Sequence, residues 1–278
     1  MGRFVSDFFN TAKSLVKIVL LSRRPTAREH CCKDGTLVIM GNGPSLADVI
    51  SGNGAYLKEH DLMAVNFAAN APEFRSLAPQ CYILADPHFF IPEGTDVNVD
   101  RLWRNLQSVD WPMTLYVPAK YRDMSRSRLG APAVDVRTFN PVGVGGFRWF
   151  RNLVYRKGLG MPRPRNVLVP AIMTGVLSGY RTIVLVGADH SWMRTLWVSD
   201  DNEVVSVQPH FYKEDEKEEM RVRHEYKGYR LHQIVESFAI AFRSYHEVEA
   251  FARSYGVDIF NATPGSFIDA FRRLEIKD

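Results

Sequence analysis

The chain has few cysteines, and their arrangement excludes two kinds of small scaffold. Only three occur in 278 residues, and two of them are adjacent, at Cys31 and Cys32. This number and spacing fit neither a disulfide framework nor the paired ligands of a structural zinc site. We therefore expect a hydrophobic core, rather than covalent links or metals, to hold the fold, and we expect the protein to lie in a reducing cytoplasm.

A hydrophobic run long enough to cross a membrane is also missing. The N-terminal stretch comes nearest, but Lys17 interrupts it before the roughly 18 to 20 apolar residues that a spanning helix needs. No small-residue cleavage site follows, so a secretory signal is not expected. The apolar residues recur at helical spacing, with Lys13 and Lys17 on the flank and Arg23 and Arg24 at the end. Residues 1–27 are therefore predicted to form an amphipathic helix that either anchors the protein at an anionic membrane surface or packs on the body or on another subunit.

Neither sign of charge dominates the sequence. The 35 basic and 31 acidic residues leave a formal charge of +4, which is too balanced to indicate a nucleic-acid partner. A hydrophobic content of 46% in 278 residues is enough for one large α/β core. We therefore assign residues 28–278 to a single domain.

The stretch from Thr36 to Leu46 matches neither of two common nucleotide-binding motifs, but like them it places a glycine-rich turn after an apolar run. An apolar run stops abruptly at the turn Gly41–Ser45, which has neither the third glycine of the dinucleotide fingerprint nor the Lys-Ser/Thr of a P-loop. Gly41 and Gly43 permit close backbone approach, and a helix that begins near Ser45, whose hydroxyl would be free to donate, would offer bare amides to an anion. A phosphate-binding turn and an ordinary tight turn between strand and helix both fit this pattern.

Small polar residues follow other apolar runs as well. The runs that begin at residues 61 and 81 end at Asn66 and Asp86, and the run 182–186 leads into Gly187, Ala188 and Asp189. In open parallel sheets the ligand lies beyond the carboxyl ends of the strands, so we expect Asn42, Asn66 and Asp86 to converge there. The sequence predicts an α/β, Rossmann-like fold with a mostly parallel sheet flanked by helices.

The remaining segments give weaker signals. Residues 122–146 are basic and interrupted by glycine and proline, which predicts a loop-rich segment. Residues 197–205 read as a β-hairpin with a polar turn. The charged run 213–223 is either a solvated helix face or part of a lid near residues 207–228. Residues 257–260 are expected to form the last strand, before a short helix through Phe271.

Several of these motifs occur together, in the same order, in a known family. They are Gly41-Asn42-Gly43-Pro44-Ser45-Leu46, Val65-Asn66, Asp86-Pro87 with Phe89-Phe90, Gly179-Tyr180-Arg181 leading to Gly187-Ala188-Asp189, and Pro264-Gly265-Ser266-Phe267. In these motifs, which cover most of residues 36–270, the chain resembles the bacterial sialyltransferases of glycosyltransferase family 42 and related surface-polysaccharide proteins.

The resemblance implies a Rossmann-like, metal-independent transferase that binds a sugar activated by cytidine monophosphate (CMP), commonly sialic acid. It places Asn42 and Asn66 at the phosphate and sugar of the donor, and Gly187 to Asp189 at the cytosine and ribose. The full set of donor-binding candidates is Gly41, Asn42, Gly43, Ser45, Asn66, Asp86, Gly187, Ala188 and Asp189. Asp86 stands where the family often has asparagine. Ser191, Trp192 and Trp197 stand in the region where the family has the tyrosines that hold the leaving phosphate, so this chain must stabilise its leaving group differently.

Transfer from such a donor needs a base for the acceptor hydroxyl, and histidine is the natural base near neutral pH. No histidine aligns cleanly with that of the family. We rank His210 first and His190 second, with His224 and His232 as further candidates.

These observations lead to one main hypothesis and two alternatives. The main one is an inverting glycosyltransferase of lipopolysaccharide or capsule assembly, peripheral to the inner membrane, that transfers sialic acid, a related nonulosonate or Kdo to a glycan or glycolipid. The first alternative is an ATP- and magnesium-dependent pterin-type pyrophosphokinase, because this chain also resembles such enzymes around the Gly-Asn-Gly-Pro-Ser-Leu motif. The second is a non-catalytic subunit that binds a nucleotide or glycan. Homo-oligomerisation is left open.

Overall fold

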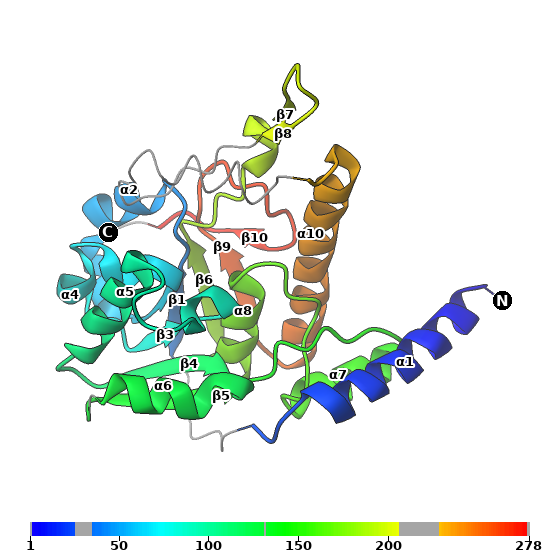
Figure 1. The fold of residues 1–278 in the computed structure, drawn as a ribbon, viewed down its shortest axis with the longest axis horizontal. Coiled ribbons are helices and arrows are strands. Elements are labelled where there is room, and N and C mark those ends of the chain that lie inside the picture. The colour runs from blue at the N-terminus through cyan, green and yellow to red at the C-terminus, as the bar shows by residue number, and fades with distance from the viewer. Residues whose placement is uncertain (1, 26–34, 131, 206–227, 277–278) are drawn as a thin grey trace.

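A parallel β-sheet forms the centre of the protein (Figure 1). The computed structural model describes residues 2–25, 35–130, 132–205 and 228–276. Within them, an eight-stranded sheet has the order β10-β9-β6-β1-β2-β3-β4-β5, and every pair of neighbours is parallel. Its strands are β1 (Thr36–Met40), β2 (Asp61–Val65), β3 (Cys81–Ile83), β4 (Met113–Pro118), β5 (Val134–Phe139), β6 (Thr182–Val186), β9 (Asp258–Asn261) and β10 (Arg272–Arg273).

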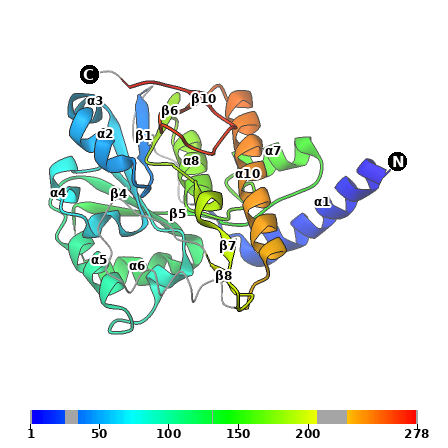
Figure 2. The same ribbon diagram turned by 90° about the horizontal axis from the view of Figure 1, so that it is seen from above.

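Helices connect the strands and cover both faces of the sheet (Figures 1 and 2). They are α1 (Gly2–Leu21), α2 (Leu46–Gly52), α3 (Gly54–Glu59), α4 (Phe74–Leu77), α5 (Val97–Gln107), α6 (Arg122–Leu129), α7 (Arg148–Arg156), α8 (Leu168–Leu177) and α10 (Leu231–Ser254), with short 3-10 turns at η1 (Asn66–Asn70), η2 (Pro87–Phe90), η3 (Ala119–Tyr121) and η4 (Trp192–Thr195). The predicted α/β fold with a parallel sheet is confirmed. The assignment of residues 28–278 to one domain stays a prediction.

Strand β1 lies where the chain reverses direction across the sheet. From β1 the chain moves outward through β2, β3, β4 and β5, and then returns to place β6 on the other side of β1. Met40 at the end of β1 is in register with Ala64 of β2 and Val186 of β6. Crossover loops therefore leave in opposite directions after β1 and β6, which opens a crevice at the carboxyl ends of these strands.

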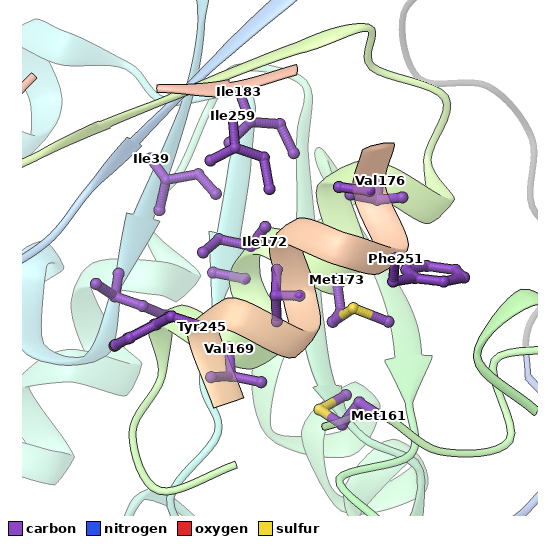
Figure 3. Packing of buried hydrophobic residues seen from close by; sticks show 14 of the residues in the cluster. Ile39, Met161, Val169, Ile172, Met173, Val176, Ile183, Tyr245, Phe251 and Ile259 are labelled. Atoms are coloured by element: carbon purple, nitrogen blue, oxygen red, sulfur yellow. The ribbon is translucent and has the colours of Figure 1, made fainter. Parts of the chain in front are cut away.

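The apolar residues of β1 serve two cores, one on each face of the sheet. Leu37 and Ile39 belong to the core under α7, α8 and α10, whereas Val38 and Met40 belong to the core under α2 and α5. Figure 3 shows Ile39 close to the apolar side chains of α8, on which Tyr245 and Phe251 of α10 also pack. A strand buried on both faces has to be apolar throughout, which explains the uninterrupted run in the sequence.

Two local predictions were wrong. Residues 122–146 are not mainly loop, because they include α6 and β5. Only Ser125 and Leu129 of α6 are buried, so this arginine-rich helix has almost no apolar periodicity, and β5 is an edge strand with partly exposed residues. Nor is β9 the last strand: β10 follows it, and no helix forms between residues 262 and 271.

Other local predictions are confirmed. The hairpin is present as β7 (Trp197–Val198) paired antiparallel with β8 (Val204–Val205). The N-terminal helix is present as α1, and no helix among the described residues is long and apolar enough to span a bilayer. The lid near 207–228 lies almost entirely outside the described residues.

Candidate functional site

Two glycine turns meet at the carboxyl ends of β1 and β6. The Gly41 amide donates to Val186 O and the Gly43 amide donates to Gly187 O, both at 2.8 Å. A Cβ on Gly41 would lie 2.4 Å from Gly187 O, and Gly187 has a φ of +62°. Side chains are therefore excluded here by both contact and conformation, and the two turns present bare backbone to the space above them.

A cleft of about 960 Å³ opens above these turns. Side chains from several strand ends and from the start of α8 line it. Among the predicted donor-binding residues, those that line it are Gly41, Asn42, Gly43, Asn66, Asp86, Gly187 and Asp189. Asn42, Asn66 and Asp86 thus share one cleft, as parallel strands require.

Ser45 and Ala188, the other two donor-binding candidates, support the cleft from beneath. We expected the Ser45 hydroxyl to be free to donate to a ligand. It instead donates to Asp189 Oδ2 at 2.8 Å and so holds that carboxylate. Ala188 is buried; its amide donates to Thr263 Oγ1 at 3.0 Å and its carbonyl accepts from Ser266 Oγ at 2.6 Å. The loop after β9 therefore fixes the turn that presents Asp189.

His190, the second-ranked base, lies in the cleft. Its ring lies 4.1 Å from that of Trp192, centroid to centroid, and burial lowers the pKa of His190 to about 3. The imidazole is therefore neutral near pH 7. Its Nδ1 lies 3.1 Å from the hydroxyl of Tyr245, which donates to Asn166 Oδ1 at 2.9 Å.

This chain of hydrogen bonds sets the tautomer of His190. Asn166 Oδ1 can only accept, so the proton of Tyr245 is directed towards it and the Tyr245 oxygen accepts from His190 Nδ1. The proton of the neutral ring is then on Nδ1, and Nε2 keeps its lone pair. His190 also has a φ of +48°, a conformation uncommon outside glycine that concentrates at functional sites.

Three cationic side chains line the cleft. Lys120, Arg165 and Arg194 are exposed, and within the described part of the chain none of them forms an ion pair. Arg194 lies over the ring of Phe267 and Lys120 over that of Tyr121, at 4.9 Å and 4.4 Å from the centroids. Asp86 and Asp189 line the same cleft, so the three cations leave an excess of one positive charge, which favours an anionic ligand.

Two buried polar atoms at the cleft have unused hydrogen-bonding capacity. Asn66 Oδ1 and Asn166 Nδ2 have no partner among the described residues. Buried polar groups are normally paired, so an acceptor and a donor are available here to a ligand. A group of three or more His, Cys, Asp or Glu side chains able to hold a metal does not occur in the described ranges.

Not every sequence prediction could be placed, and the sequence missed several cleft residues. His210, ranked first as the base, and His224 lie outside the described residues, while His232 is exposed on α10. Tyr245, Asn166, Lys120 and Arg194 were missed. Tyr245 carries no signal of its own, because it falls on the apolar stripe of α10.

The comparisons with known proteins show similarity at the level of the fold. No protein-family model and no curated protein matches the sequence. The chain is similar in structure to the MAf glycosyltransferase from Magnetospirillum magneticum AMB-1, with a TM-score of 0.53 and 12% sequence identity. Its fold is similar to that of a bacterial glycosyltransferase. The alignment covers 98% of this chain but only 38% of the Magnetospirillum protein, so this chain spans well under half the length of that relative.

Proposed function

We propose that the protein is an inverting glycosyltransferase of bacterial surface-polysaccharide assembly that uses a CMP-activated keto acid sugar, either a sialic acid-like nonulosonate or Kdo, and transfers it to a hydroxyl of a glycan or glycolipid. The observation that carries the proposal is the pair of interlocked turns, Gly41–Ser45 and Gly187–Asp189, beneath one large cleft. The fold similarity to a bacterial glycosyltransferase and the family 42 motifs support the same function.

The charges of the cleft support an anionic donor. A CMP-activated keto acid sugar has a phosphate and a carboxylate, and Lys120, Arg165 and Arg194 offer three cations to these groups. In the reaction the bond between the anomeric carbon and the phosphate oxygen breaks, and its electron pair leaves with CMP. Cations already in place stabilise this developing charge without reorganisation. Here they would stabilise the leaving phosphate in place of the tyrosines that family 42 uses. We propose that donor binding and transfer need no metal ion, as the resemblance to family 42 implies.

His190 is the base that the described residues support best. The acceptor hydroxyl attacks the anomeric carbon on the face opposite CMP and gives its proton to Nε2, the nitrogen with the free lone pair. A pKa of about 3 makes the ring a weak base in the empty cleft. A bound phosphate and carboxylate favour the imidazolium and raise that pKa, so His190 gains basicity when the donor is present. Tyr245 acts as a positioning residue because it holds Nδ1–H.

Nucleotide binding provides the first test. We would measure thermal shifts with CMP, CDP, UDP, GDP and ATP, each with and without magnesium, because a ligand that binds only the folded state raises the melting temperature. A shift with CMP that does not depend on magnesium is expected. A shift confined to ATP with magnesium would favour the pyrophosphokinase instead, and a shift with UDP or GDP would keep glycosyl transfer but reject the proposed donor.

Turnover of a CMP-activated keto acid sugar tests the chemistry. His190→Ala should lower the rate of CMP release by roughly two to four orders of magnitude and leave CMP affinity nearly unchanged. CMP binding without turnover of any such donor would instead favour a non-catalytic subunit. An active His190→Ala enzyme would direct attention to His210.

The role of Tyr245 can be separated from general stability. Tyr245→Phe should lower kcat about 5- to 150-fold, the equivalent of one hydrogen bond to a reacting group, and should change the pH profile of kcat. Tyr155→Phe is the matched control, because Tyr155 is also a buried tyrosine but does not line the cleft. Its hydroxyl donates to Val144 O, at a distance of 3.1 Å. Equal effects of the two substitutions on kcat and on its pH profile would contradict a positioning role.

A further inference from the structure

Helix α1 packs on the body through its polar face. Ser14, which is only 3% exposed, donates to Gly145 O at 3.1 Å and accepts from the Gly145 amide at 3.0 Å. Thr11 Oγ1 accepts from the Phe147 amide at 3.1 Å, and Ser22 donates to Leu159 O. The hydroxyls of Ser14 and Thr11 in α1 therefore satisfy backbone groups before α7, and that of Ser22, just after α1, satisfies one that follows α7.

The apolar face of α1 points away from the body as a result. At about 100° per residue, most of its apolar side chains form one broad stripe opposite Ser14, whereas Ile18 and Leu21 lie on the Ser14 side. Nine apolar side chains of α1 are at least 47% exposed, and Val19 and Leu20 reach 79% and 74%. The nine are Phe4, Val5, Phe8, Phe9, Leu15, Val16, Val19, Leu20 and Leu21. This is the reverse of a surface helix that buries its apolar side, and apolar surface of this extent marks an interaction site.

Helix α7 extends this apolar surface. The ring of Phe4 packs on Phe147 at 5.3 Å between centroids, and Phe147 stacks on Trp149 at 6.5 Å. Trp149 is 67% exposed and Leu153 on the same helix is 47% exposed. In Figure 1, α1 projects beyond the body towards its N-terminus. We call the exposed apolar residues of α1, together with Trp149 and Leu153, the α1–α7 face.

Basic side chains border the α1–α7 face. Lys13 and Lys17 lie on one flank of the apolar stripe of α1, and Arg23 and Arg24 follow its end. The sequence of α1 contains a single acidic residue, Asp7, and that of α7 contains none. An apolar surface with a basic rim has the two features that hold a peripheral protein at an anionic lipid surface.

We propose that the α1–α7 face binds the interfacial region of a bilayer that contains anionic lipids, with Trp149 at the headgroup level and the basic rim on the lipid phosphates. This surface is separate from the cleft and does not depend on the proposed reaction. A second copy of the chain fits the face less well. Pairing two such faces would bring two basic rims together, with Asp7 as the only acid of either helix to offset them.

Co-sedimentation of the full chain with lipid vesicles tests the proposal. The protein should bind vesicles of phosphatidylcholine with phosphatidylglycerol, and bind pure phosphatidylcholine more weakly. Val19→Asp should weaken binding about tenfold or more, because it removes an apolar side chain that the bilayer would bury and adds a charge that anionic lipids repel. Val97→Asp is the matched control, since Val97 is 71% exposed on α5, far from α1 in the sequence, and should leave binding unchanged. Trp149→Ser should also weaken binding, which would establish the contribution of α7.

Charge reversal gives a second test that leaves the apolar stripe intact. Lys13→Glu combined with Lys17→Glu should weaken binding to the anionic vesicles, whereas Lys58→Glu, at an exposed position of α3, should not. Equal binding by the Val19→Asp and Val97→Asp proteins would overturn the proposal. So would a dimer, seen by analytical ultracentrifugation, that Val19→Asp dissociates while neither protein binds vesicles.

Discussion

His190 should make the stability of the protein depend on pH in a way that one substitution removes. Burial holds its pKa in the folded protein at about 3, below the ordinary value of 6.5. Between these values the unfolded chain takes up a proton that the folded protein does not, so this contribution to stability is present above about pH 6.5 and is lost as the pH falls towards 3. From pH 7 to pH 5 the loss attributable to His190 is about 2 kcal/mol.

The assay is urea unfolding at pH 7 and at pH 5, followed by circular dichroism, for the wild-type protein and for His190→Asn. Asparagine tolerates the positive φ at this position. The variant should lose about 2 kcal/mol less than the wild type between the two pH values, whatever its stability at pH 7, since other titrating groups are common to both. His232→Asn, on the exposed side of α10, measures the effect of replacing a different histidine. Equal pH dependence in the wild-type and His190→Asn proteins would refute the reasoning.

Three further predictions concern the cleft and the attachment of α1. Gly43→Ala would place a Cβ 1.9 Å from Asp189 Oδ2, and should destabilise the protein by about 1 to 3 kcal/mol in urea unfolding and weaken CMP binding. Ser14→Ala leaves both the amide and the carbonyl of Gly145 without their partner, and should cost about 1 to 3 kcal/mol, measured as faster hydrogen exchange in α1. Arg165→Ala should weaken CMP binding several-fold at low salt, with a smaller effect at high salt, measured by isothermal titration; a salt-independent loss would argue against a charge contact.

The core of the sheet and the floor of the cleft could be predicted from the sequence because they follow from strand geometry. A strand buried on both faces has to be apolar, and parallel strands place their last residues along one edge. Asn42, Asn66 and Asp86 could therefore be placed together although they are far apart in the chain. The helix α6 could not be predicted in the same way, since its few buried side chains leave no apolar period.

The details of the site depend on contacts that no local pattern records. Tyr245 occupies a core position of α10, and its hydroxyl becomes significant only because Asn166 and His190 lie beside it. Similarly, the sequence predicts an apolar stripe on α1 but not the side on which the helix docks. Backbone groups at Gly145 and Phe147 need hydroxyl partners, and that requirement turns the apolar side outward.

The position of β1 between β2 and β6 has a consequence for the order of events during synthesis. Strands β2 to β5 follow β1 in sequence and can join the sheet one after another as they leave the ribosome. The other edge of β1 pairs with β6, from Thr36 with Thr182 to Met40 with Val186, so it stays open while about 140 residues are added. At typical rates of elongation this takes about 7 to 28 s. During that time the open edge of β1 can pair with a strand of another chain, and the turn Gly41–Ser45 lacks its partner, the turn Gly187–Asp189. The nascent protein therefore keeps an aggregation-prone edge at β1 until the strand that completes the floor of its cleft has been made.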